Sequence, residues 1–413
     1  MKILIKNIKQ IVGIEESGMN YRSGESMQVL NTLDDSYLIT EEEKIQDYGK
    51  MENLKVVESD FDKVLDATGK MVFPSFVDSH THLVYAGSRE IEYGDKIRGL
   101  SYEEIAKRGG GILNSAKLLH ETSEEELFNQ AKIRINDIIA MGTGAVEIKS
   151  GYGLTVEDEL KMLRVIRRLK EETPVIIKAT FLGAHAVPAA YKGNQKGYVD
   201  LVIQEMLPRV AEEQLADFVD VFCDKGFFTV EETHRILKAA SDLGLQPKIH
   251  ANELDYSGGI EVGVNNNALS VDHLEYTGNS EIMTLLKSDT MPTILPGAAF
   301  FLGMIHAPAR KMIEAGLPVA LASDFNPGSS PSGNMQLIAA MGCINYKMLP
   351  EEVINATTLN TAYAMGVEKE VGSITRGKRA NLFISKPMPT YNYLPYSYGD
   401  NKVETVILNG KII

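Results

Sequence analysis

The sequence predicts an α/β protein: a (β/α)₈ TIM barrel with a small β-sandwich domain built from both chain termini. Two observations predict this fold. Eight short apolar segments alternate with amphipathic segments through the middle of the chain, and strand-like segments without intervening helices occupy both ends. Parallel strands that are buried on both faces carry continuous apolar residues, as these eight segments do. We expect residues 71–369 to form the barrel and residues 1–70 plus 370–413 to form the β domain.

The two ends of the chain contain strand signals separated by turns rich in Gly and Asp. Because the same pattern appears at both ends, one domain assembled from the two termini is the simplest interpretation. The expected strands are 1–7, 36–42, 53–59 and 63–69 near the N-terminus, with further strands inside 372–386 and 402–413.

Eight strand–helix units over the middle of the chain favour a closed barrel. An open doubly wound sheet is the alternative, and no GxGxxG motif follows the first strand to support it. The expected strands are MVFPSFVDSH (71–80), GAVEIKSG (144–151), PVIIKATFLGAH (174–185), FVDVFCDKG (218–226), LQPKIHANE (245–253), ALSVDHLE (268–275), MPTILPG (291–297) and PVALASDFN (318–326). Amphipathic segments that begin with helix-start signals predict helices over 123–140, 155–172, 229–244 and 280–289.

The segment between the first two barrel strands, residues 83–143, is too long for a simple βα connection. Insertions after barrel strands commonly build the substrate pocket, because the active site lies at the carboxyl ends of the strands. We therefore expect this insertion to contribute to a binding site.

Charge and composition exclude several classes of protein. The formal net charge of −14 argues against nucleic-acid binding, which needs clustered Lys and Arg. No apolar run approaches the roughly 18 residues of a membrane span, and the first residues lack the pattern of a secretory signal. Two widely separated cysteines give no disulfide framework. A reduced, cytoplasmic setting is the expectation.

Most of the histidines are expected at the end of the barrel where active sites lie. Five of the eight histidines and one aspartate lie at or just after the carboxyl ends of expected strands. His80 and His82 stand one residue apart, so in a strand both face the same side. Three imidazoles and a carboxylate suit Zn²⁺ or Fe²⁺ and leave room for a water. The six residues are His80, His82, His185, His250, His273 and Asp324, whereas His120, His234 and His306 are expected to be structural or exposed.

Other residues near strand ends are suited to proton transfer and substrate binding. Glu253 could take a proton from an activated water, or it could instead interact with a helix N-terminus. His273 could stabilise developing negative charge. Arg89 suits a carboxylate, and Tyr152 suits a directional hydrogen bond. Lys149 and Lys225 are candidates for a carbamylated lysine that bridges two metals, but Lys225 lies past its strand, so a single metal is expected.

In this arrangement, HxH on the first strand, His on the fifth and sixth, and Asp on the eighth, the chain resembles the amidohydrolase superfamily. Within it, segments along the whole barrel resemble the imidazolonepropionase family. They are FVDSHTHLVYAGSRE, RGGGI, EIKSGYGL, FLGAHAVP, FCDKGFF, HANEL, SVDHLE, LPGAAFFLG and SDFNPGSSPSGNM.

The resemblance implies hydrolysis of the cyclic amide of 4-imidazolone-5-propanoate to N-formimidoyl-L-glutamate, a step of histidine degradation. It implies one Zn²⁺ or Fe ion per subunit and a homodimer. Glu253, His273 and Asp324 would be catalytic. The implied metal ligands are His80, His82, His250 and Asp324, and the implied substrate contacts are Arg89, Tyr152, His185, Glu253, Asn326, Gly328 and Ser329.

Three alternatives stay open at this point. A deaminase of a purine, pyrimidine or related ring would use the same metal site with another pocket, although the GSRE and SGYG segments argue against it. A barrel without metal that serves as a scaffold would not need the complete His and Asp set. A metal-storage or sensing protein would place its ligands on exposed loops.

Overall fold

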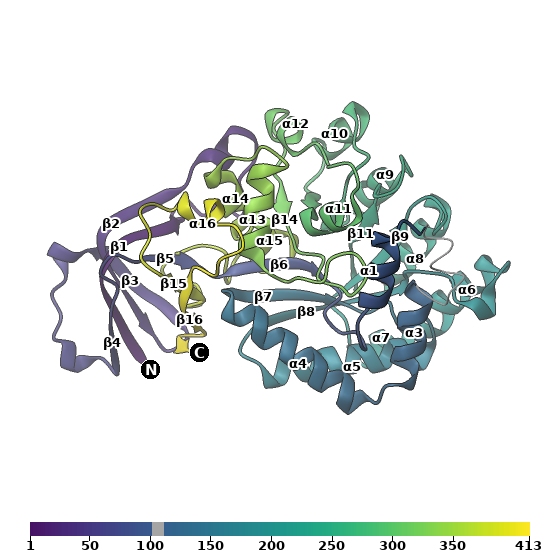
Figure 1. Ribbon diagram of the computed structural model, residues 1–413, viewed down its shortest axis with the longest axis horizontal. Helices are drawn as coiled ribbons and strands as arrows, with labels where there is room; N and C mark the ends of the chain where they lie inside the picture. Colours follow the sequence, from purple (N-terminus) through teal and green to yellow (C-terminus); the bar gives the residue numbers. More distant parts are fainter. Residues whose placement is uncertain (101–110) are drawn as a thin grey trace.

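A computed structural model describes residues 1–100 and 111–413 of the chain. A parallel barrel lies beside a separate sheet to which both termini contribute, so N and C lie close together at one end of the molecule (Figure 1). The predicted fold class is confirmed. The letters RGG of the RGGGI segment, residues 108–110, lie outside the described residues.

The barrel consists of parallel strands whose neighbours in the sheet follow the order of the chain. β10 and β11 both pair with β9, so they form one barrel strand interrupted at Lys248. The strands are β6 (Phe76–Thr81), β7 (Thr143–Lys149), β8 (Ile176–Ala184), β9 (Phe218–Cys223), β10 (Gln246–Pro247), β11 (Ile249–Ala251), β12 (Ser270–His273), β13 (Met291–Ile294) and β14 (Ala320–Leu321).

The barrel closes where the first strand, β6, meets the segment after the last, β14. The backbone N–H of Asp324 donates to the carbonyl of His80 at 3.0 Å, and that of His82 donates to the carbonyl of Phe325 at 2.9 Å. A parallel bridge between Thr81 and Phe325 lies at the same place. The chain thus closes its barrel with backbone bonds of three expected metal ligands.

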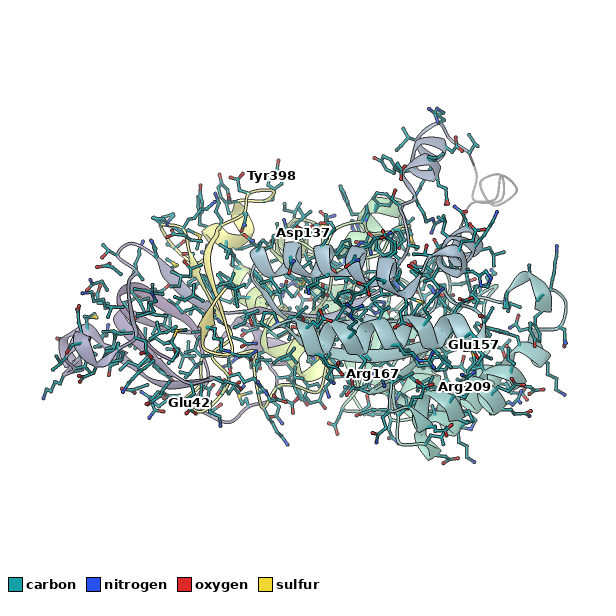
Figure 2. The ribbon with its side chains drawn as sticks, turned by 90° about the horizontal axis from the view of Figure 1, so that it is seen from below. Glu42, Asp137, Glu157, Arg167, Arg209 and Tyr398 are labelled. Atoms are coloured by element: carbon teal, nitrogen blue, oxygen red, sulfur yellow. The ribbon has the colours of Figure 1, made fainter. Side chains whose placement is uncertain are left out.

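The predicted amphipathic helices surround the barrel, and their first turns are capped as the sequence suggests. Ser123 accepts from Glu126 N–H, and Thr229 accepts from Glu232 N–H in a capping box. Charged side chains such as Glu157, Arg167 and Arg209 lie on the outer surface (Figure 2). The helices of the barrel region are α1 (Glu90–Ile97), α3 (Ile112–Glu121), α4 (Glu124–Ala140), α5 (Val156–Glu172), α6 (Gln195–Leu201), α7 (Leu207–Glu212), α8 (Val230–Asp242), α9 (Gly259–Asn265), α10 (Asn279–Leu285), α11 (Pro296–Leu302), α12 (Ala309–Glu314), α13 (Met335–Ile344), α14 (Pro350–Ala356) and α15 (Leu359–Ala364).

The terminal sheet is mainly antiparallel and runs in the order β17-β16-β15-β5-β1-β2-β3, with β4 pairing to β1. Its core contains Ile3, Ile5 and Leu38 from the N-terminus with Leu382 and Ile407 from the C-terminus. Its strands are β1 (Lys2–Ile14), β2 (Asn31–Glu41), β3 (Lys44–Lys50), β4 (Lys63–Asp66), β5 (Met71–Pro74), β15 (Leu382–Ser385), β16 (Val403–Leu408) and β17 (Lys411–Ile412), and a short helix α16 (Tyr393–Tyr396) precedes β16.

Two strand predictions were wrong in this sheet. Residues 53–59 form no strand, and their end enters a 3₁₀ turn at Glu58–Asp60. Met71–Pro74, expected to begin the first barrel strand, pairs instead with β1 and β15. One apolar run, residues 71–77, serves both sheets, so no local pattern marks where the chain passes from the terminal sheet into the barrel. The division at residues 70 and 370 stays a prediction. Within the described residues, no helix is long and apolar enough to span a bilayer.

Candidate metal centre and active-site pocket

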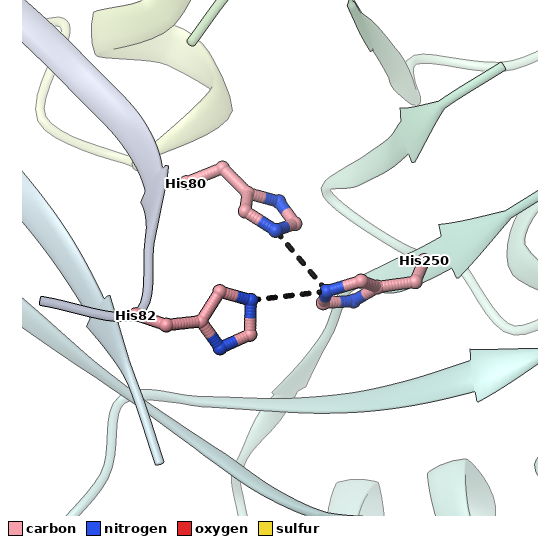
Figure 3. Close-up of side chains that lie close together, drawn as sticks. All are labelled: His80, His82 and His250. Carbon is pink, nitrogen blue, oxygen red and sulfur yellow. Dashed lines mark hydrogen bonds between the residues drawn. The ribbon is translucent and has the colours of Figure 1, made fainter. Parts of the chain in front are cut away.

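Three imidazoles converge at the carboxyl end of the barrel. His80 ends β6, His82 follows it, and His250 lies in β11. The Nε2 atom of His250 lies 3.1 Å from Nε2 of His80 and 3.3 Å from Nε2 of His82 (Figure 3). All three rings are buried, and burial lowers the pKa of His80 and of His82 well below the ordinary value. Three imidazoles whose nitrogens face one another form a donor set for a cation.

The outer nitrogens of two of these rings are held by buried carboxylates. Nδ1 of His80 lies 2.6 Å from Asp272, and Nδ1 of His250 lies 2.9 Å from Asp220. Because a carboxylate can only accept a hydrogen bond, each Nδ1 is the donor, and each Nε2 keeps its lone pair for a metal. Asp324 Oδ1 lies 3.6 Å from Nε2 of both His80 and His82. The residues present therefore fit a metal ion.

An ion-pair network lies beneath the imidazoles inside the barrel. Lys149 Nζ lies 2.5 Å from Glu147 and 2.8 Å from Asp220, and Lys248 Nζ pairs with the second oxygen of Glu147. All five side chains of the network, which includes Asp272, are fully buried. Burial opposes the charge of Lys149, but Asp220 and Glu147 raise its pKa above the ordinary value. With every member ionised, three carboxylates face two ammonium groups, and the excess negative charge favours a cation above them.

The two lysines considered for metal bridging have other roles. Lys149 is fully engaged with carboxylates below the imidazoles. Lys225 is exposed and pairs with Asp255 at 2.7 Å. Neither is placed to bridge a pair of metals, and the single-metal site stays a prediction.

The loop after β14 places Asp324 by a compact set of hydrogen bonds. The Asn326 side chain accepts from the backbone N–H of Gly328 and of Ser329, both at 2.8 Å. Its amide donates to the Asp324 carbonyl at 2.6 Å. Burial raises the pKa of Asp324 to about 7 despite the opposing charge of His250. Asn326 thus shapes the loop with the same atoms that a substrate contact would use.

His185 and Tyr152 form an aromatic wall beside His82. The rings of His82 and His185 are stacked with centroids 5.1 Å apart, and Tyr152 lies 5.5 Å from His185. Nδ1 of His185 lies 3.0 Å from the Gly151 carbonyl, so it donates and leaves Nε2 as an acceptor. Burial lowers the pKa of His185 to about 3, so the ring is neutral.

A second acid–base group lies across the centre, at the end of β12 and in the loop after β11. His273 Nε2 lies 3.8 Å from Glu253 Oε2. Asp224 holds the Glu253 loop by accepting from the backbone N–H of Glu253 at 2.7 Å and of Leu254 at 2.8 Å. Burial, then the charges of Asp324 and Asp224, raise the pKa of Glu253 to about 8. A carboxyl with that pKa can both take up and release a proton near neutral pH.

Arg89 begins α1 on another wall of the pocket. Its guanidinium pairs with Glu92 at 2.6 and 2.9 Å, and Glu92 also accepts from the Gly111 N–H at 3.0 Å. A Cβ atom added to Gly328 would lie 2.0 Å from Nη1 of Arg89. Only a glycine at position 328 leaves room for the guanidinium in this position.

These residues surround one cavity of about 440 Å³. Every residue expected to be catalytic, to ligate a metal or to bind substrate lines it, except the fully buried His80. As expected, His120, His234 and His306 lie outside it and are exposed or structural. The expected residues in the lining are His82, Arg89, Tyr152, His185, His250, Glu253, His273, Asp324, Asn326, Gly328 and Ser329.

Several functional candidates were missed from the sequence. Asp220, Asp272 and Lys248 lie inside apolar parallel strands, and a charged residue in a strand buried on both faces was an available signal. Glu92 and Lys96 also line the cavity, but nothing in the local sequence of the insertion distinguishes them from solvated charges.

Comparison with known proteins agrees with this geometry. A model of the amidohydrolase family matches residues 71–413. The chain belongs to the amidohydrolase family.

Similarity within the family is much closer to one group of enzymes. The chain is 54% identical to imidazolonepropionase of Flavobacterium johnsoniae and 52% identical to that of Christiangramia forsetii, with all of each chain covered. It is 43% identical to imidazolonepropionase of Alkaliphilus oremlandii, covering all of this chain and 97% of the relative. Within the amidohydrolases, the chain falls among the imidazolonepropionases.

Solved structures with low sequence identity share the fold. A triazine hydrolase variant matches with a TM-score of 0.75 at 14% identity, covering all of this chain and 94% of that one. An adenosine deaminase from Xanthomonas campestris with bound zinc matches with a TM-score of 0.69 at 16% identity, covering 99% and 92%. At this identity the likeness shows the architecture alone.

Proposed function

We propose that this protein hydrolyses 4-imidazolone-5-propanoate to N-formimidoyl-L-glutamate with the help of one metal ion. The similarity of more than half of all residues to imidazolonepropionases over the full chain supports the reaction. The observation that carries the site assignment is that one cavity contains the imidazole group and, on another wall, the Arg89 guanidinium. A ring with an attached carboxylate is the kind of substrate that such a cavity suits.

His80, His82, His250 and Asp324 would hold the metal, which we propose is Zn²⁺ or Fe. When bound, such an ion lowers the pKa of a water and polarises a carbonyl group. Asp272 and Asp220 orient the imidazoles of His80 and His250, so the nitrogen atoms are already in place before a cation arrives.

Arg89 would bind the propionate carboxylate with its planar pair of N–H groups. Glu92 fixes the guanidinium in the free protein, and Gly328 leaves the space that it occupies. Tyr152 and His185 would contact the ring, and the loop of Asn326, Gly328 and Ser329 would border the substrate. This placement turns the carbonyl of the ring toward the imidazoles.

Glu253 would accept a proton from the attacking water as the oxygen bonds to the carbonyl carbon. His273, whose Nε2 lies 3.8 Å from Glu253, would stabilise the negative charge that develops on the carbonyl oxygen. The bond between this carbon and the ring nitrogen then breaks, and Glu253 returns the proton to the leaving nitrogen. Asp324, with a pKa near 7, is the second candidate for this transfer.

Turnover of 4-imidazolone-5-propanoate by metal-loaded protein tests the proposal. We expect the ultraviolet absorbance of the ring to disappear and one equivalent of N-formimidoyl-L-glutamate to form without release of ammonia. Release of ammonia from a purine or pyrimidine, with no loss of the imidazolone, would instead assign the site to a deaminase.

The metal, the assembly and the location complete the proposal. We propose one ion per subunit, a homodimer and a cytoplasmic location, in keeping with two cysteines that form no disulfide. Elemental analysis of protein purified without added metal distinguishes zinc from iron. Light scattering after size-exclusion chromatography measures whether the mass is that of one chain or of two.

A further inference from the structure

The end of β12 has an unusual backbone. His273 and Leu274 both have positive φ, 85° and 74°. Residues with side chains rarely adopt this conformation, and consecutive cases persist only where the surroundings hold them. Here the backbone N–H of Leu274 donates to Ala251 at 3.2 Å and that of Tyr276 donates to Asn252 at 2.9 Å. The strained turn is therefore fixed to the strand that carries His250.

This turn brings Glu275 back beside His273. Glu275 Oε2 lies 4.0 Å from His273 Nδ1, while Glu253 Oε2 lies 3.8 Å from Nε2 of the same ring. One imidazole thus lies between two carboxyl groups. Glu253 lines the substrate cavity, whereas the Glu275 side chain is fully buried behind the ring and does not reach the cavity.

The polar atoms behind the ring have no hydrogen-bond partner in the described part of the chain. They are both carboxyl oxygens of Glu275, Nδ1 of His273 and the hydroxyl of Tyr346, and all are buried. Among the residues that the structure describes, Glu275 is the only carboxyl group in this condition. Burying such a group costs stability, so its presence calls for a functional reason.

The unpaired atoms are complementary. An imidazole N–H and a phenol O–H are donors, and a carboxyl group offers an acceptor to each. After burial, the charge of Glu275 is the next cause that raises the pKa of Tyr346. Burial and then the charge of Glu253 raise the pKa of Glu275 itself. At 4.0 Å, Glu275 Oε2 is one small movement away from a hydrogen bond with Nδ1 of His273.

We propose that Glu275 is a positioning residue for His273. One carboxyl oxygen accepts the Nδ1–H of His273, and the hydroxyl of Tyr346 donates to the other. With Nδ1–H held by Glu275, Nε2 is the ring nitrogen that faces Glu253 and the cavity. The proton that Glu253 takes from the attacking water can then be shared with Nε2, whose N–H stabilises the carbonyl oxygen until the same proton returns through Glu253 to the leaving nitrogen. This inference rests on the proposed function, because it assigns how His273 acts in that reaction.

Three substitutions at position 275 and its neighbour test the role. In Glu275→Met the acceptor is lost, and we expect kcat to fall about tenfold with little change in KM, as for one hydrogen bond lost from the transition state. Glu275→Gln keeps an amide oxygen that accepts from Nδ1–H, so most of kcat should return. Tyr346→Phe should lower kcat less than Glu275→Met. Glu352→Gln, a buried carboxyl on α14 paired with Arg310, is the control and should alter stability alone.

Two further measurements separate positioning from a general structural effect. In a His273→Asn background, Glu275→Met should cause no further loss of kcat, because its effect passes through the ring. Glu275→Met and Glu352→Gln should both lower the midpoint of thermal unfolding, because each weakens a buried interaction, but only Glu275→Met should lower kcat. An additive loss in the double variant, equal losses in the Met and Gln variants, or unchanged kcat in Glu275→Met would overturn the proposal.

Nitrogen NMR of histidine-labelled protein gives a readout without substrate. We expect the ring of His273, assigned by its absence in His273→Asn, to carry its proton at Nδ1 and to change to Nε2–H in Glu275→Met. Proton at Nε2 in the unmodified protein would overturn the proposal. If the NMR result holds while wild-type protein does not turn over the imidazolone, the proposed function fails and the assignment of Glu275 stands.

Discussion

The two sides of the active site differ in how their histidine rings are hydrogen-bonded to carboxyl groups. On the metal side, His80 and His250 each have Nδ1 within 2.9 Å of a buried carboxylate. On the opposite side, which we call the His273 side, the nearest carboxyl oxygens are 3.8 and 4.0 Å from the ring. Carboxylates orient two of the three imidazoles that would hold a cation, whereas Nδ1 of His82 is buried without a partner among the described residues. On the His273 side, where we propose that a proton is gained and lost during the reaction, neither carboxyl group is within hydrogen-bond distance of the ring.

The surroundings of the two sides differ in the same way. Asp220 and Asp272 on the metal side are themselves held by Lys149 and Lys248, so the imidazoles of His80 and His250 are each oriented through two successive layers of charge. On the His273 side, Glu253 has a pKa raised to about 8 mainly by burial and the charge of Asp324. Rigid charge pairs therefore favour binding, and unpaired buried groups favour proton transfer.

Removing the metal should have the largest effect on activity, because the residues of the metal side act through the bound ion. Dialysis against a chelator should abolish turnover, and Zn²⁺ or Fe²⁺ should restore it. It should also lower the midpoint of thermal unfolding, because a ligand that binds only the folded state stabilises it. His234→Ala, which alters an exposed histidine, is the control and should retain metal. Full activity in metal-free protein would show that the reaction does not need a metal ion, and the proposed difference between the two sides would be wrong.

Glu253→Gln should give the next largest effect, because it disables the His273 side while leaving the metal side intact. We expect kcat to fall by about 10²- to 10⁴-fold at unchanged metal content. A base must be deprotonated, so kcat/KM should rise with pH through the pKa of Glu253. A bound cation favours the carboxylate and moves that pKa below its metal-free value of about 8. The acid limb of the pH profile should be absent in the variant, and an unchanged limb would assign it to another group.

Arg89 lies outside both sides, so its substitution should separate substrate binding from chemistry. Arg89→Ala should raise KM about 10- to 100-fold, the effect of losing charge-assisted hydrogen bonds. Gly328→Ala should raise KM as well, because its Cβ would meet the guanidinium at 2.0 Å. Gly94→Ala in α1 is the control, since alanine is tolerated within a helix. An unchanged KM in Arg89→Ala would remove the carboxylate-binding role.

Lys149→Met should weaken metal binding, although Lys149 does not line the cavity. Removing the buried lysine that pairs with both Asp220 and Glu147 should cost about 3–5 kcal/mol of stability. Disturbed support of the imidazoles should weaken metal binding by about 10- to 100-fold. Lys225→Met breaks an exposed pair with Asp255 and should cost less than about 1 kcal/mol. Chelator competition and thermal unfolding measure both quantities, and equal effects of the two variants would contradict the network.

Much of this arrangement could be predicted from the sequence, because each barrel strand is a short apolar run with a polar residue at its end. That pattern placed His80, His82, His250, His273 and Asp324 on one face of the barrel. The change of sheet at residues 71–76 could not be predicted, since one continuous apolar run serves both sheets.

What the sequence did not predict depends on contacts between distant segments. Lys248 and Glu147 become partners only when the barrel closes. In the sequence, Glu275 is an ordinary acidic residue after a strand. Its position behind His273, without a hydrogen-bond partner among the described residues, depends on a backbone turn that its neighbours impose. Local patterns thus locate the chemistry, and tertiary contacts determine the state of each group.

The seam of the barrel has a further consequence. His80 lies in the first barrel strand, His82 directly follows that strand, and Asp324 follows the last strand; two backbone bonds join these segments. A cation bound to these side chains would act as a cross-link that ties the beginning of the barrel to its end. Closing such a long loop is the entropically costly step in forming a barrel. The ion would then stabilise the closed barrel as well as take part in the reaction.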